Sequence, residues 1–178
     1  MMRTIFNCRS GRAGSRITLA ALLVIGTLLS VTQAGAAENA PAVDSVKKVV
    51  WHVDYGDPIR LGRMLTSVNN MLTTYEEMFA DHDIRIVFLG AGIRFVTSDP
   101  LTKTPFEEDK ILKQERKVLT ERLQSAIGQG IKLELCKITA TAVNLDEAKV
   151  TKGVALVPSG VVRIAELQSK GFAYLKAD

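Results

Sequence analysis

Short apolar runs alternate with longer amphipathic stretches from Lys47 onward, and this alternation is the feature that most constrains the fold. The runs are rich in β-branched residues, as strands are, and cover residues 49–53, 84–89, 131–138, 154–157 and 172–175. Apolar residues in the stretches between them recur at helical spacings of three and four. Strands and helices in this alternation form a mostly parallel sheet with helices on both faces. The sequence therefore predicts an α/β fold, a three-layer α/β/α domain with about five strands, whose order stays open.

Capping residues predict where the first two helices begin. Asp57 stands before Pro58, so a helix is expected to start there and to end near Ala80. Thr104 and Glu107 have the spacing of a capping box, which predicts the start of the second helix.

Similar signals apply to the last third of the chain. Asn144 with Glu147 predicts a short third helix before Gly153. Ser159 is expected to cap a fourth helix, and Gly171 to end it.

The first 36 residues differ from the rest of the chain. They carry four arginines, an apolar run at residues 17–29 and a small-residue segment at 34–36, the layout of a secretory signal peptide. The apolar run is shorter than the roughly 20 residues that a transmembrane helix needs. We expect residues 1–36 to be a cleaved signal peptide, 37–46 a flexible N-terminal lead and 47–178 the folded domain. The protein would then be exported to the periplasm; an uncleaved N-terminal anchor is the alternative.

Removal of the leader changes the charge of the protein. The whole chain has 23 basic and 19 acidic residues, and the leader takes away four arginines and no acid, which leaves 19 of each. The neutral composition does not imply a basic face for nucleic acid. We therefore expect no nucleic-acid partner, and no membrane association once the leader is cleaved.

The two cysteines, Cys8 and Cys136, are separated by the same cleavage. Cys8 leaves with the leader, so Cys136 has no intramolecular disulfide partner. A lone thiol in an oxidising compartment indicates intermolecular pairing, a reactive thiol or a thiol hidden by burial.

Ligands of open parallel sheets bind beyond the carboxyl ends of the strands. Cys136 is the only strong nucleophile at these ends and is the candidate catalytic residue. The candidate pocket or anion-binding residues at the same edge are His52, Asp54, Arg94, Ser159 and Gly160.

The reactivity of Cys136 depends on its ionisation. A free thiol has a pKa of about 8.5, and cations or helix N-termini lower it. Arg94 and the amides of Ser159 and Gly160 are the candidates for that role. The alternative is a buried cysteine that acts as a small apolar side chain.

Two further sites receive little support. Residues 90–92 (Gly-Ala-Gly) lack the third glycine of a dinucleotide loop, because position 95 is Phe, and a tight turn is expected there. The two histidines, His52 and His82, lack the spacing of metal ligands. We expect no metal and no cofactor. A Cys136–His52 catalytic pair would require the two strand ends to converge.

Several segments together resemble the DsrE/DsrF-like family, over about Lys47 to Lys176. These segments are Val49–Asp54, the helix with Asn69-Asn70, Phe88–Ile93, Leu133–Cys136, Val157–Val161 and Leu167–Tyr174. The resemblance implies an α/β/α domain that assembles into homo-oligomers, as trimers or hexamers. It also implies a role in sulfur relay, in which the strand-end cysteine, here Cys136, accepts sulfur as a persulfide from a donor protein and passes it to an acceptor.

Two functions follow as hypotheses. The first is a periplasmic sulfur-relay protein with sulfurtransferase-like chemistry at Cys136, which leaves open whether the chain is an enzyme by itself. The second is a non-catalytic oligomeric module of the same fold that binds a small ligand or anion, with an inert Cys136. A redox sensor that forms an intermolecular disulfide is a third reading.

Overall fold

The structure is a computed structural model that describes residues 46–177. The predicted signal peptide, residues 37–45 of the predicted lead and Cys8 lie outside the described residues. Within the described part the strands are β1 (Lys47–Val53), β2 (His82–Phe88), β3 (Lys132–Cys136), β4 (Val154–Val157) and β5 (Ala173–Leu175). The helices are α1 (Pro58–Glu77), α2 (Lys110–Gly128), α3 (Lys137–Ala142) and α4 (Gly160–Ser169), with short 3-10 helices η1 (Gly90–Phe95) and η2 (Glu147–Lys149).

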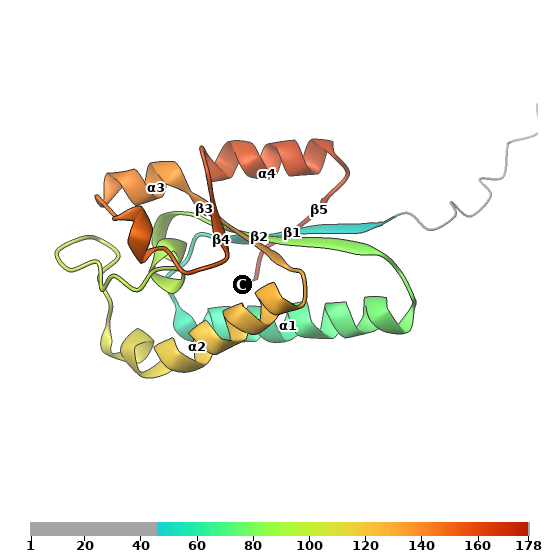
Figure 1. Cartoon of the computed structure of the whole chain (residues 1–178), viewed down its shortest axis with the longest axis horizontal. Coiled ribbons are helices and arrows are strands. Elements are labelled where there is room, and N and C mark those ends of the chain that lie inside the picture. The colour runs from blue at the N-terminus through green and yellow to red at the C-terminus, as the bar shows by residue number, and fades with distance from the viewer. Residues whose placement is uncertain (1–45, 178) are drawn as a thin grey trace, which may run out of the picture. The chain divides into compact units, whose positions relative to one another are not determined.

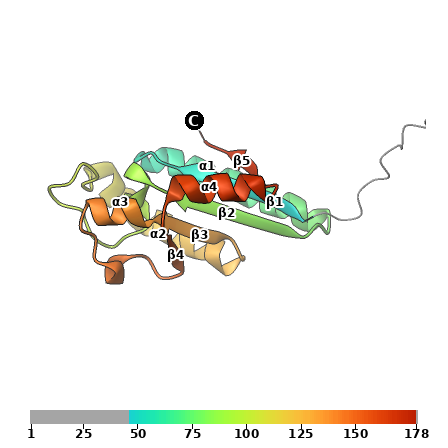
Figure 2. The same ribbon diagram turned by 90° about the horizontal axis from the view of Figure 1, so that it is seen from above.

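The strands form one parallel sheet in the order β4-β3-β2-β1-β5. Helices α1 and α2 cover one face, and α3 and α4 lie on the other (Figure 1). Figure 2, seen from above, shows α4 lying over the strands. The predicted three-layer α/β/α fold is confirmed. No helix within residues 46–177 is long and apolar enough to span a membrane.

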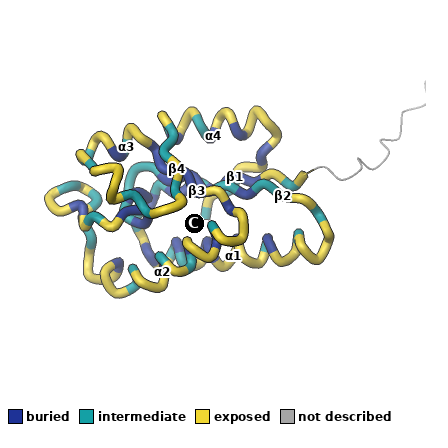
Figure 3. The backbone as a smooth tube through the Cα atoms, in the orientation of Figure 1, coloured by how far each residue is buried: buried dark blue, intermediate teal, exposed yellow. Residues whose placement is uncertain are grey.

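The core has two parts because strand side chains alternate between the faces of the sheet. The larger part lies between the sheet and helices α1 and α2, and includes Leu61, Phe88 and Leu135. The smaller part lies under α4, where Val50 and Val87 pack with Ile164, Leu167 and Phe172. Figure 3 shows these buried positions along the strands and on the helix sides that face the sheet. Full burial of one such side chain stabilises the fold by about 1.5–3 kcal/mol.

The predicted starts of the first and fourth helices are confirmed. The Asp57 carboxylate accepts the Ile59 N–H at 2.8 Å and caps α1. The Ser159 hydroxyl accepts the Val162 N–H at 3.4 Å and caps α4. Both caps depend only on residues next to the helix, which is why the local sequence sufficed.

The predicted start of the second helix is wrong. Thr104 and Glu107 make capping-type bonds, in which their side chains accept the N–H groups of Phe106 at 3.1 Å and Lys103 at 2.8 Å, but these bonds close a turn. The next amide, that of Glu108, donates to the Pro100 carbonyl at 2.9 Å, which prevents the helix from continuing. Helix α2 begins at Lys110 instead, capped by Asp109.

The third helix also differs from the prediction. Helix α3 starts directly after Cys136, so β3 ends two residues earlier than expected. Asn144 caps no helix; it follows α3 with a φ of +52°, a conformation that asparagine tolerates. The short η2 comes next and is capped by Asp146, which accepts the Ala148 N–H at 2.9 Å.

Candidate functional site

Cys136 lies at the carboxyl edge of the sheet, as the last residue of β3 and the cap position of α3. The chain after β2 leads to α2 on one face, whereas the chain after β3 enters α3 on the other (Figure 1). Ligands of open α/β sheets bind where neighbouring connections diverge in this way. Cys136 therefore occupies the position in this fold where chemistry is expected.

The start of α4 approaches Cys136 closely. Val157 of β4 pairs with Cys136 in the sheet, and α4 begins three residues later at Gly160. A Cβ atom on Gly160 would lie 3.1 Å from Cys136 Cβ and 3.2 Å from Leu89 Cδ2. Glycine at position 160 therefore lets the first turn of α4 pack directly against the thiol.

Polar groups of α3 and of the start of α4 act on the Cys136 thiol. The backbone N–H groups of Ile138, Thr139 and Gly160 and the Thr139 hydroxyl favour its charged form and lower its pKa. The Thr139 hydroxyl oxygen accepts the Gly90 N–H at 3.1 Å, which joins α3 to η1 beside the thiol. This arrangement suits a thiolate, an acceptor without a hydrogen of its own.

Two opposing effects set the ionisation of Cys136. Burial is the largest single effect and raises its pKa, because the residue is only 5% exposed. Together the hydrogen bonds from Gly160, Thr139 and Ile138 outweigh burial and hold the pKa of the thiol below its ordinary value. The site therefore favours the reactive thiolate without a cationic side chain.

His52 and Asp54 belong to a different group of side chains at the same edge. His52 Nδ1 lies 2.8 Å from the Tyr174 hydroxyl, and Lys176 Nζ donates to Asp54 Oδ2 at 2.7 Å. His52 Nε2 lies 3.8 Å from Asp54 Oδ2. We call these four residues the tail cluster, because they join the end of β1 to residues 174–176. Burial is the main reason that the pKa of His52 is lowered; Asp54 opposes the shift and Lys176 adds to it.

One strand of the sheet separates His52 from Cys136. Strand β2 lies between β1 and β3, so the two residues are about 10 Å apart across two strand spacings. The ring of His52 is bonded to Tyr174 instead. The geometry does not bring the candidate Cys–His pair together.

Arg94 does not reach the thiol either. Its guanidinium donates to Asp109 Oδ2 at 2.8 Å, and to the carbonyls of Glu107 at 2.8 Å and Gly56 at 3.3 Å. Arg94 therefore ties η1 to the start of α2. Among the candidates for lowering the pKa of Cys136, the Gly160 amide has this effect, whereas the Ser159 side chain caps α4.

The residues 90–92 form the start of η1, and their glycines have a packing role. A Cβ atom on Gly92 would lie 2.3 Å from the Val53 carbonyl oxygen, so only glycine fits against the end of β1. Within residues 46–177, no group of three or more His, Cys, Asp or Glu side chains is placed to hold a metal ion.

Sequence reasoning missed two residues of this site. Thr139 stands three positions after Cys136, a spacing typical of helix N-termini that the apolar run 131–138 obscured. Glu134 stands two positions before Cys136 and shares its face of the sheet. It is 4% exposed and accepts hydrogen bonds from Arg163 and Arg85. Burial raises the pKa of Glu134, and the two arginines outweigh burial and lower it.

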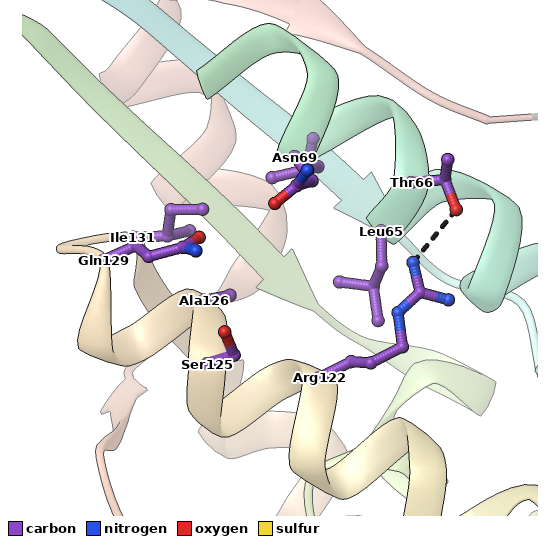
Figure 4. A pocket seen from close by; sticks show the side chains of 9 residues that line it. Leu65, Thr66, Asn69, Arg122, Ser125, Ala126, Gln129 and Ile131 are labelled. Atoms are coloured by element: carbon purple, nitrogen blue, oxygen red, sulfur yellow. Dashed lines mark hydrogen bonds between the residues drawn. The ribbon is translucent and has the colours of Figure 1, made fainter. Parts of the chain in front are cut away.

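A separate groove of about 300 Å³ lies between α1 and α2 (Figure 4). Arg122 reaches across it from α2 and donates to the Thr66 hydroxyl on α1 at 3.0 Å. The groove is on the face of the sheet opposite α4 and is not part of the Cys136 site.

The DsrE/DsrF-like family model matches residues 47–177. The chain belongs to the DsrE/DsrF-like family. Among solved structures, a protein of unknown function from Methanobacterium thermoautotrophicum, MTH1491, is similar in fold: identity is 24%, the TM-score is 0.56, and the match covers 72% of this chain and 96% of that one. The ychN protein from E. coli matches with 15% identity and a TM-score of 0.48, over 74% of this chain and 99% of its own. No curated protein matches the chain.

Proposed function

We propose that this protein carries sulfane sulfur as a persulfide on Cys136, in sulfurtransferase-like chemistry between a donor and an acceptor. The observation that supports this most is the position of Cys136 at the end of β3, where Gly160 packs against it and the amides of α3 and α4 lower the pKa of its thiol. Membership in the DsrE/DsrF-like family supports a sulfur-relay type of protein at the level of the family.

Loading begins with attack by the Cys136 thiolate on the outer sulfur of a persulfide or polysulfide donor. A bond forms between Sγ and that sulfur while the S–S bond of the donor breaks, and the donor leaves as a thiolate with the electron pair. One S–S bond replaces another, so the step needs no external oxidant.

Discharge reverses the roles. An acceptor thiolate attacks the outer sulfur, the bond to Cys136 Sγ breaks, and Cys136 leaves as a thiolate. A thiol with a lowered pKa leaves faster. A lowered pKa of Cys136 therefore assists both steps: it raises the fraction of attacking thiolate in the first and makes Cys136 a better leaving group in the second.

The surface near the thiol suits contact with another protein. Ile138 on α3 and Val161 and Val162 on α4 are large apolar side chains with exposures of 62%, 65% and 55%. All three stand within two residues of Thr139 or Gly160 in the sequence. We propose that donor and acceptor proteins dock here, because apolar groups of this kind favour protein contacts.

Export and assembly are part of the same proposal. The arginine-rich, apolar N-terminal sequence supports cleavage after residue 36 and a periplasmic location. N-terminal sequencing of protein from the periplasmic fraction tests this. Family membership supports a homo-oligomer, proposed as a trimer or hexamer, which light scattering measures.

Mass spectrometry tests the persulfide directly. The purified protein is incubated with polysulfide, and the peptide with Cys136 should gain the mass of one sulfur atom, which a reductant removes. The Cys136→Ser variant should gain none. Absence of the gain in the wild-type protein, or an equal gain in the variant, contradicts the proposal.

The 5% exposure of Cys136 favours a second candidate, a module of the same fold that binds a small ligand or anion and keeps an inert thiol. In that case iodoacetamide should leave Cys136 unmodified under native conditions and label it only after unfolding. Rapid native labelling that persists below the ordinary thiol pKa of about 8.5 excludes this candidate.

A further inference from the structure

A buried ion pair joins α4 to the strand that carries Cys136. Arg163 Nε donates to Glu134 Oε2 at 2.7 Å, and Arg163 Nη2 donates to Glu134 Oε1 at 2.8 Å. Glu134 Oε1 also accepts from Arg85 Nη1 of β2 at 2.9 Å. A guanidinium fork on a carboxylate fixes orientation as well as distance. The pair therefore helps to set where α4 lies on the sheet, together with the apolar contacts of Ile164 and Leu167.

The two ends of this pair stand next to the thiol site in the sequence. Glu134 is two residues before Cys136 on β3, so both side chains point to the face that α4 covers. Arg163 is three residues after Gly160, one helical turn into α4. Displacement of this turn would carry the Gly160 N–H away from Cys136 Sγ.

We propose that Glu134 is a positioning residue for Cys136: by holding Arg163 with both carboxylate oxygens, it fixes the first turn of α4 and keeps Gly160 packed against Cys136. This role of Glu134 concerns the same thiol as the proposed function. It rests on that function only for the use to which the thiolate is put.

The charge of Glu134 and its positioning role have opposite effects on the thiol. A nearby negative charge disfavours a thiolate, so neutralising Glu134 would by charge alone make Cys136 more reactive. Gln at 134 would also place an NH₂ donor against the donors of Arg163, which breaks the fork. If positioning dominates, Glu134→Gln makes Cys136 less reactive.

The test measures the rate of iodoacetamide alkylation of Cys136 in the folded protein as a function of pH. We expect Glu134→Gln to slow alkylation at neutral pH about tenfold, as the loss of one hydrogen bond to a charged sulfur would, and to move the midpoint of the profile to higher pH. Arg163→Lys keeps the positive charge but cannot form the fork, so it should act in the same direction. This second variant decides the outcome if Glu134→Gln does not fold.

Asp83→Asn is the matched control. Asp83 accepts hydrogen bonds from Arg85 on β2 and Lys132 on β3, in the same network, and these bonds do not involve α4. This control removes one negative charge, as Glu134→Gln does, and should leave the alkylation midpoint where it is in the wild-type protein.

The results separate the inference from the proposed function. The positioning role is overturned if alkylation is faster or unchanged in Glu134→Gln and unchanged in Arg163→Lys. It is also overturned if Asp83→Asn slows alkylation equally. Both conclusions hold even if the wild-type protein takes up sulfur. Slowing in the first two variants alone supports the role, even if polysulfide adds no sulfur to Cys136.

Discussion

Two places along the carboxyl edge of the sheet, the ends of β3 and β1, treat polar groups in different ways. At the end of β3, backbone amides and the Thr139 hydroxyl, rather than a cationic side chain, lower the pKa of the Cys136 thiol. At β1, the tail cluster is made of side-chain pairs, in which Tyr174 bonds to His52 and Lys176 bonds to Asp54. The first arrangement leaves a charge stabilised but unneutralised, which suits a nucleophile. The second neutralises its charges within the group, which suits attachment of the C-terminal segment.

The comparison predicts that changes near Cys136 alter thiol reactivity, whereas changes in the tail cluster alter only stability. Alkylation rate and resistance to urea are therefore measured together on every variant below.

Gly160→Val should have the largest effect. Its Cβ would press on Cys136 and Leu89 at 3.1–3.2 Å, so the start of α4 must move outward. We expect a loss of about 1–3 kcal/mol in unfolding free energy from overpacking, and a fall of about tenfold or more in alkylation rate at neutral pH. Gly128→Val is the matched control, since a Cβ at 128 meets nothing within 4 Å. Equal alkylation in the two variants would contradict the close approach of α4.

Thr139→Val should have a smaller effect on reactivity. The change keeps the shape of the side chain but removes one donor to Cys136 Sγ and the acceptor of the Gly90 N–H. We expect alkylation about fivefold slower, with a midpoint at higher pH, and a stability loss of about 1–3 kcal/mol. Thr141→Val, an exposed site on the same helix, should leave the midpoint unchanged.

Tyr174→Phe should affect stability alone. It removes the hydroxyl that bonds to His52 Nδ1 at 2.8 Å. The expected loss is about 0.5–1.5 kcal/mol in urea unfolding, with alkylation of Cys136 unchanged. A change in thiol reactivity would mean that the tail cluster and the Cys136 site are coupled.

The smallest effect should be the pH dependence from His52. Because burial lowers the pKa of His52 below the ordinary value of 6.5, the unfolded chain binds a proton at higher pH than the folded one does. Stability should therefore decrease as the pH falls below about 6.5 and level off below the folded pKa. In urea titrations at about pH 7 and about pH 5, His52→Asn should show a shallower decrease than the wild-type protein. The control is His82→Asn, which removes the other histidine; an equal change there would contradict the assignment.

Local chemistry explains which parts could be predicted from sequence. The caps Asp57 and Ser159 bond to amides two or three residues away, so their sequences determine them. The end of β3 could not be predicted from local sequence. The β-branched Ile138 continues the strand pattern, but in the structure it lies on α3 and is 62% exposed.

The candidate site could likewise be predicted only where local sequence determines it. Gly160 was a candidate because Ser159 predicted a helix N-terminus there. The partners of Arg94 and Glu134 depend on strand order and on where α2 begins, and neither can be derived from residues near them. The candidate cation, Arg94, therefore lies elsewhere, and the residues next to Glu134 give no signal of its partners.

The position of β1 between β2 and β5 has a consequence for how the chain matures. His52 and Tyr174 are 122 residues apart, so β1 acquires its second neighbour only when residues 173–175 have been synthesised. An unfinished chain has β1 as an edge strand with unpaired backbone groups, and part of the surface under α4 lacks Phe172. The sheet and the core under α4 are therefore completed only by the last segment of the domain, residues 172–175.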